Sequence, residues 1–223
     1  MTDNLKISVY NMEKELNITQ GFLYNLKDQD DWSFVIKAHS LLEGSVSQLL
    51  SQVMGNENFN EIFSQMELSN KKTGKVAFVK ALNILEKRDR RFISFFSELR
   101  NKLVHNVSNV DFSIEKYVNS LSKAKERELI KKLQIIDATE LIPYKSKDYK
   151  VEELIKIDAK FLFWYLSVYL IAIIYQNKEL RIEQKLQKET KEKLNYYQLK
   201  KEAMEASRAG AIFDKIISTM KSS

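Results

Sequence analysis

The stretch RFISFFSELRNKLVH, residues 91–105, decides the fold class of this 223-residue chain. At 100° per residue, its largest apolar side chains fall within about 60° of Phe92 on a helix. These are Phe92, Phe95, Phe96, Leu99 and Leu103. Such a stripe is typical of a helix that packs on a protein core.

The rest of this helix divides into two faces. Arg91, Glu98 and Lys102 form a face that we expect to be solvated. The remaining arc mixes apolar, hydroxyl and functional side chains: Ile93, Ser94, Ser97, Arg100, Asn101, Val104 and His105. It suits contact with either a second helix of the same chain or a symmetry mate.

Helical periodicity continues outward from this segment in both directions. The expected helices cover roughly residues 5–26, 32–54, 73–85, 90–106, 114–125 and 151–175, with an irregular stretch around Pro143 and Tyr144. Five Gly and one Pro are few for this length, which favours long helices. We therefore predict an all-α, up-and-down helical bundle with a long C-terminal helical extension.

The apolar run from Phe161 to Tyr175 marks the end of the predicted bundle. It is shorter than the roughly 20 residues of a membrane span, and Lys156, Asp158 and Lys160 lie where it would have to extend. A buried central helix is the better interpretation, with no membrane partner. We expect a bundle over residues 1–175 and a charged helical extension over 176–223, interrupted at Ala209-Gly210.

The composition excludes several classes of site. The chain has no Cys, so it has no thiolate metal site and no cysteine nucleophile. Two His, without a His-Glu-x-x-His motif or a Gly-rich phosphate loop, predict neither a metal nor a cofactor. No secretory signal is visible at Met1, so we expect a cytoplasmic protein.

Positive charge gathers around the motif helix. Residues 71–106 carry 10 basic and 3 acidic groups, a net charge of +7. This field would attract RNA, and Arg88, Arg90, Arg91 and Lys102 could track its backbone. Ordinary solvated faces of a lysine-rich protein explain the same charges.

Three functional side chains converge at the end of the helix. Asn101 and His105 are four residues apart and so lie on neighbouring turns, and the long Arg100 side chain can reach the same point. An Arg offers paired donors to a phosphate, and a His can move protons near neutral pH.

The segment SELRNKLVHN, residues 97–106, resembles the signature helix of the HEPN superfamily of RNA-cleaving and RNA-binding domains. The segment IKAHSLLEG, residues 36–44, is similar to the earlier core helix of such domains. The resemblance is strongest over residues 30–125.

The resemblance implies a metal-independent endoribonuclease that acts as a homodimer. The RNA 2′-OH would attack the adjacent phosphorus, giving a 2′,3′-cyclic phosphate and a 5′-OH end. His105 would transfer a proton, Arg100 would stabilise the phosphoryl charge, and Asn101 would orient His105 or the phosphate. Such a protein would be a toxin or an anti-phage defence effector that cleaves tRNA or mRNA, with an antitoxin or regulatory protein as partner.

Two other functions stay open. A non-catalytic HEPN scaffold would dimerise and bind RNA or a protein, with the extension as its interaction element. A helical partner protein without any nucleic-acid role would carry the motif by coincidence.

Two residues of the second helix could support the site. Glu43 could hold Arg100 through a charge-assisted pair, or it could be a carboxylate at the edge of the core. His39 lies on the apolar stripe of the same helix, which favours a hydrogen-bonded core histidine over a functional one.

Overall fold

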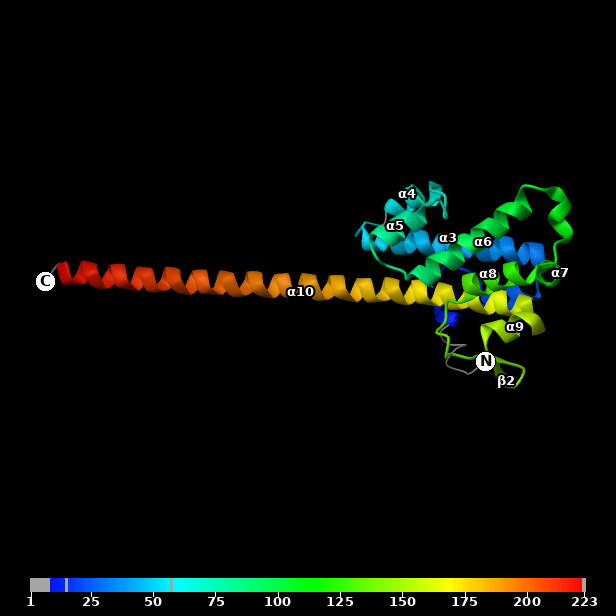
Figure 1. Ribbon diagram of the computed structural model, residues 1–223. Helices are drawn as coiled ribbons and strands as arrows, with labels where there is room; N and C mark the ends of the chain where they lie inside the picture. The colour runs from blue at the N-terminus through cyan, green and yellow to red at the C-terminus, as the bar shows by residue number, and fades with distance from the viewer. Residues whose placement is uncertain (1–8, 15, 57, 222–223) are drawn as a thin grey trace. The chain divides into compact units, whose positions relative to one another are not determined.

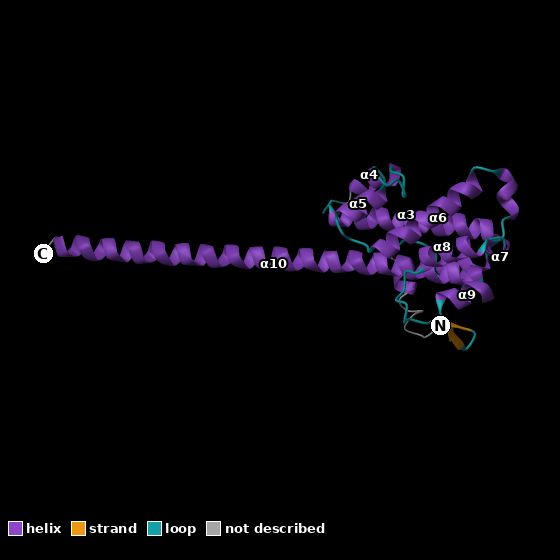
Figure 2. Cartoon of the chain, in the orientation of Figure 1, coloured by secondary structure: helices purple, strands orange, loops and turns teal. Residues whose placement is uncertain are grey.

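The computed structural model describes residues 9–14, 16–56 and 58–221. The prediction of an all-α protein is confirmed: helices dominate, and the sheet in the described part of the chain has only two strands (Figures 1 and 2). The chain divides into two compact units, Met1–Lys178 and Glu179–Ser223. The sequence had placed this boundary three residues earlier.

Helices α3 and α6 pack against each other in the first unit (Figure 1). Helix α3 covers Asp31–Val53, and the Asp30 side chain accepts a hydrogen bond from the Ser33 N–H at its start. Helix α6 covers Lys87–Val104 and begins with a capping box between Glu86 and Asp89. Both helices had been predicted to within a few residues.

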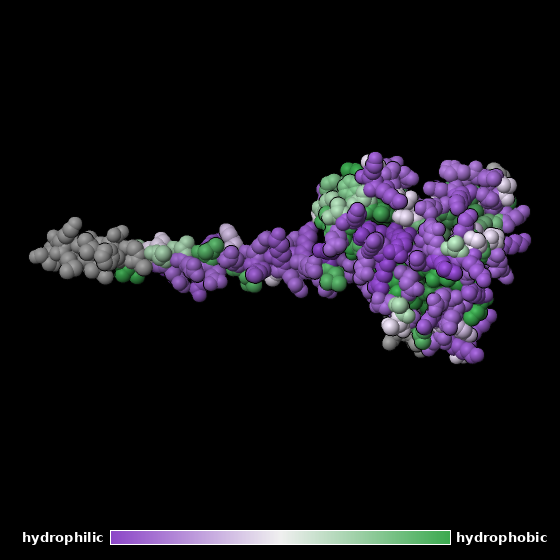
Figure 3. Space-filling model, viewed as in Figure 1, coloured by the Kyte–Doolittle hydropathy of each residue, from purple (hydrophilic) through white to green (hydrophobic). Residues whose placement is uncertain are grey.

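Two short helices cover one end of this pair. Helices α4 (Phe59–Gln65) and α5 (Lys75–Ala81) both contact α3. Gly74 precedes α5, and a Cβ at this position would lie 2.6 Å from the Glu67 carbonyl oxygen, so the turn requires glycine. Apolar side chains gather on the surface over α4 and α5 (Figure 3). Ile62 of α4 is one of the exposed apolar residues of the chain.

The N-terminal part is more broken than predicted. Residues 9–14 are helical, and α2 (Phe22–Asn25) and a 3-10 turn, η1 (Leu26–Asp28), follow after a turn. Asn17 and Gly21 have positive φ angles there, so the expected single helix over 5–26 is wrong across this turn. Residues 5–8 lie outside the described part.

The segment after α6 also differs from the prediction. A 3-10 turn, η2 (Val107–Asp111), leads to α7 (Ile114–Asn119) and α8 (Lys123–Leu133), so the chain breaks within the helix predicted over 114–125. The side chain of Ser122 caps α8, which explains the break. Strands β1 (Ile142–Tyr144) and β2 (Lys147–Tyr149) then form an antiparallel hairpin in the region expected to be irregular.

Two helices complete the chain. Helix α9 covers Val151–Ile157 and α10 covers Ala159–Lys221. Asp158 leaves the helical conformation and its Oδ1 accepts from the Phe161 N–H, so the predicted single helix from Val151 is wrong. The predicted interruption at Ala209-Gly210 is wrong as well, because α10 continues through it.

The first part of α10 is the central helix of the first unit. Phe163 is completely buried and packs edge-on against Phe95 of α6, with ring centroids 5.7 Å apart. The five residues of the predicted α6 stripe are all buried. A window of α10 is long and apolar enough to cross a membrane, but 56% of it is buried inside the protein, as in a core helix.

Candidate functional site

A polar pocket of about 300 Å³ opens between α3, α6 and the end of α4 with the segment that follows it. Helix α3 contributes His39 and Glu43, α6 contributes Ser97, Arg100 and Asn101, and residues 64–69 form the remaining wall. Most of these side chains carry hydrogen-bonding groups, which makes the pocket a candidate for a polar ligand.

Arg100 and Asn101 come together at this pocket. The Arg100 Nη1 donates to the Asn101 Oδ1 at 3.1 Å, and both residues are half-buried. Among the described residues, no carboxylate lies within 4.0 Å of the Arg100 guanidinium. The guanidinium therefore keeps donors and positive charge for a ligand.

His105 lies beyond the pocket, at the exposed end of the same helix. It is the C-cap residue of α6, and its N–H donates to the Asn101 carbonyl at 3.3 Å. It follows Asn101 by four residues and so lies on the same side of the helix. The structure thus groups Arg100 with Asn101 and places His105 about one turn further on.

The face of α6 that mixes polar and apolar residues is covered partly by the chain itself. Ser97 is buried, and its Oγ lies 3.1 Å from the His39 Nε2 of α3. Ile93, one turn earlier, is also completely buried. At Ser97, a helix of the same chain is the partner, while Arg100, Asn101, Val104 and His105 at the end of the face are half-buried or exposed.

Glu43 pairs with a lysine that the sequence analysis missed. The Lys75 Nζ donates to the Glu43 Oε1 at 2.9 Å, and the Lys75 side chain is completely buried. Of the two interpretations of Glu43, the carboxylate at the edge of the core fits this contact, and among the described residues the ion pair of Glu43 is with Lys75 and not with Arg100. Lys75 is the first residue of α5, and only the tight turn at Gly74 directs it inward, so a local pattern could not reveal it.

His39 is surrounded by both neutral and charged groups. Its Nδ1 lies 3.9 Å from the Glu43 Oε2, and the residue is 5% exposed. Burial lowers the pKa of His39 from 6.5 to about 4; Glu43 opposes this shift, while Arg100 and Lys75 add to it. The imidazole is therefore neutral near pH 7, in the environment of a core histidine.

The arginines at the start of α6 all contact protein groups. Arg88 pairs with Asp137 at 2.6 Å and with Glu86 at 3.0 Å. Arg90 donates to the Leu85 carbonyl, and Arg91 donates to the Lys131 carbonyl at 2.9 Å. Lys102 is exposed on the solvated face.

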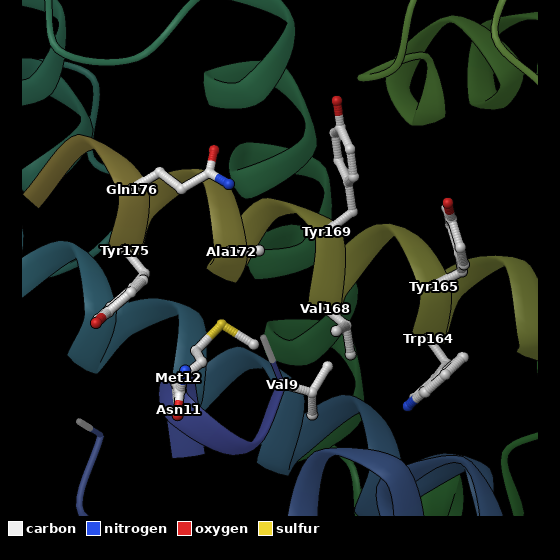
Figure 4. A pocket seen from close by; sticks show the side chains of 10 residues that line it. All are labelled: Val9, Asn11, Met12, Trp164, Tyr165, Val168, Tyr169, Ala172, Tyr175 and Gln176. Carbon is white, nitrogen blue, oxygen red and sulfur yellow. The ribbon is translucent and has the colours of Figure 1, made fainter. Parts of the chain in front are cut away.

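A second pocket, of about 240 Å³, lies between residues 9–12 and α10 in the first unit (Figure 4). Four aromatic side chains line it: Trp164, Tyr165, Tyr169 and Tyr175. None of the described residues around it is charged, so it offers little to acid–base or phosphate chemistry. The Trp164 Nε1 donates to the Leu23 carbonyl, which agrees with the expected packing role of this helix.

No protein-family model, curated protein or solved structure matches the chain. Within the described residues, no three His, Asp or Glu side chains are grouped so that they could hold a metal ion.

Proposed function

We propose that the chain cleaves RNA without a metal at the C-terminal end of α6. One observation carries the proposal: Arg100 contacts the amide of Asn101 instead of a carboxylate, at the edge of an open pocket and about one turn from the exposed His105. The resemblance of this segment to the HEPN signature helix supports the same function.

The reaction follows from these groups. The fork of Arg100 would donate to two oxygens of the scissile phosphate, and the Asn101 amide nitrogen would donate to a third acceptor. The 2′-oxygen would attack phosphorus as it loses its proton, while the 5′-oxygen leaves and gains one. His105 is accessible for one of these proton transfers.

The need for two proton transfers favours a homodimer. Each chain has only two His, and His39 is buried and neutral. A second copy would supply a second His105 across a composite cleft, one acting as base and the other as acid. A role as a toxin or anti-phage effector under a regulatory protein would suit a cytoplasmic ribonuclease of this size.

The test is incubation of the purified chain with total bacterial RNA in EDTA. We expect cleavage to 2′,3′-cyclic phosphate ends, reduced by about 10²–10³-fold in both Arg100→Ala and His105→Ala. Arg91→Ala is the matched control, because it removes an arginine of the same helix outside the site.

Other outcomes would change the proposal. Cleavage that persists in both site variants would exclude this site. RNA affinity that falls with salt, without cleavage products, would indicate the non-catalytic scaffold instead. Light scattering that shows a strict monomer at micromolar concentration would exclude the composite cleft.

A further inference from the structure

We infer that the pocket beside Arg100 binds the nucleobase next to the scissile phosphate, and that Glu43 selects a base that presents an amino group. The inference rests on the proposed function for the position of the phosphate. It adds a specificity site, with guanine as the preferred base and uracil as the disfavoured one.

The charges of the pocket wall favour a hydrogen-bond donor over a second anion. Glu43 and Glu67 both line the pocket, against the single cation Arg100 at its edge. Lys75, which pairs with Glu43, is fully buried and is not among the lining residues, so a phosphate deeper in the pocket would meet the oxygens of two carboxylates. A base amino or imino group would instead find acceptors there.

The buried lysine fixes the orientation of the selecting carboxylate. Lys75 holds the Glu43 Oε1 at 2.9 Å, and the Oε2 lies 3.9 Å from the Nδ1 of His39, beyond hydrogen-bond distance. The Glu43 side chain is 31% exposed although Lys75 is fully buried. One carboxylate oxygen is thus anchored, and the other is free to accept a bond from a ligand.

The size and the other walls of the pocket also suit a base. Its volume of about 300 Å³ lies at the lower end of the range for small-ligand pockets. Met66 offers an apolar surface, and the amides of Gln65 and Asn101 offer both donors and acceptors.

The bases differ in what they present to a carboxylate. Guanine presents its N1–H and its amino group side by side, one for the free Glu43 Oε2 and the other for an amide oxygen of the wall such as that of Gln65, whereas adenine and cytosine present only an amino group as donor. Uracil presents one N–H between two carbonyl oxygens, which a carboxylate repels. Glu43 therefore predicts the order guanine, then adenine and cytosine, then uracil.

The test is calorimetric titration of the full chain with 3′-GMP, 3′-UMP and inorganic phosphate. We expect 3′-GMP to bind about tenfold or more tightly than 3′-UMP. Glu43→Gln should abolish this preference, because an amide can pair with uracil as well as with guanine. Glu98→Gln, on the solvated face of α6, is the matched control and should keep it.

A second variant separates selection from folding. Glu43→Gln leaves the buried Lys75 against a neutral amide, so the double variant Glu43→Gln/Lys75→Met is measured beside it, since removing both charges of a buried pair is often tolerated. This variant should retain the helical circular dichroism and still lose the preference for guanine. A folded double variant that keeps the preference would overturn the role of Glu43.

The outcomes also distinguish this inference from the proposed function. If both nucleotides bind no more tightly than inorganic phosphate, the base site is excluded while the phosphate site stands. If 3′-GMP is preferred but RNA is not cleaved, the base site stands and the catalytic proposal fails. If neither the nucleotides nor phosphate bind, both are excluded.

Discussion

The two ends of α6 use the same residue type in different ways. At its start, Arg88, Arg90 and Arg91 all donate to carboxylates or carbonyl groups of the protein. At its end, among the residues that the structure describes, Arg100 donates only to the amide of its neighbour Asn101. The first arrangement ties the helix to the segments around it, and the second leaves a cation available to a ligand.

The difference depends on where the nearby carboxylates are engaged. Glu43 lies close enough to the site to oppose the lowering of the His39 pKa, but its carboxylate is paired with Lys75. The buried Lys75 therefore holds a carboxylate that could otherwise bind Arg100, whereas the arginines at the start of α6 are bound to protein groups. Each prediction below either removes this contrast or measures it.

The largest effect is expected from removal of Glu43. Glu43→Ala leaves the completely buried Lys75 without its carboxylate, which should lower the free energy of unfolding by about 3–5 kcal/mol. Lys75→Met should cost less, because Glu43 is 31% exposed and water can solvate its charge. Urea denaturation measures both values.

The Lys75→Met variant should also remove the difference between the two ends of α6, because it frees a carboxylate near Arg100. With Glu43 released, its carboxylate can compete with RNA for Arg100, which lines the same pocket, and cleavage of RNA should fall although Arg100 is still present. Equal destabilisation by Glu43→Ala and Lys75→Met would contradict the asymmetric burial of this pair.

The next effect concerns the pH dependence of stability. The pKa of His39 is about 4 in the folded protein and 6.5 in the unfolded chain, so only the unfolded chain gains a proton as the pH falls between these values. The stability contributed by neutral His39 is present above pH 6.5 and is lost as the pH falls toward 4. The loss should reach up to about 3 kcal/mol.

His39→Gln provides the comparison for this measurement, since Gln can still hydrogen-bond to Ser97. The free energies of unfolding of the wild type and the variant should approach each other from pH 7 to pH 4. A difference that is constant with pH would show that His39 is not buried in its neutral form.

The sequence predicted much of the fold and only part of the site. The stripes of α3 and α6 and the central position of the first part of α10 follow from periodicity, because burial of apolar side chains dominates helix placement. The breaks at Asn17, Ser122 and Asp158 depend on single turns and caps, which periodicity does not reveal. The burial of Lys75 depends on contacts with α3 that are 32 residues away in sequence.

A smaller effect on RNA cleavage, different at the two ends of α6, is expected when an arginine is replaced by lysine, which keeps the charge and changes only the shape of the side chain. Arg100→Lys keeps the charge but loses the planar fork, so cleavage of RNA should fall by about 10-fold to 100-fold. Arg91→Lys, at the other end, should leave cleavage unchanged. The ratio of initial cleavage rates measures the effect, and equal rates for wild type and Arg100→Lys would exclude a bidentate phosphate contact.

The smallest effect is expected at the start of the helix. Arg88 joins Glu86 to Asp137, but Asp137 is 72% exposed and the pair is screened by solvent. Arg88→Ala should therefore lower the free energy of unfolding by about 1 kcal/mol or less and leave cleavage of RNA unchanged. Thermal unfolding beside the cleavage assay measures both quantities. If Arg88→Ala reduced cleavage as strongly as Arg100→Ala without affecting stability, RNA would contact the start of α6 as well. An ion pair with Glu86 and Asp137 would then not be enough to exclude Arg88 from RNA binding.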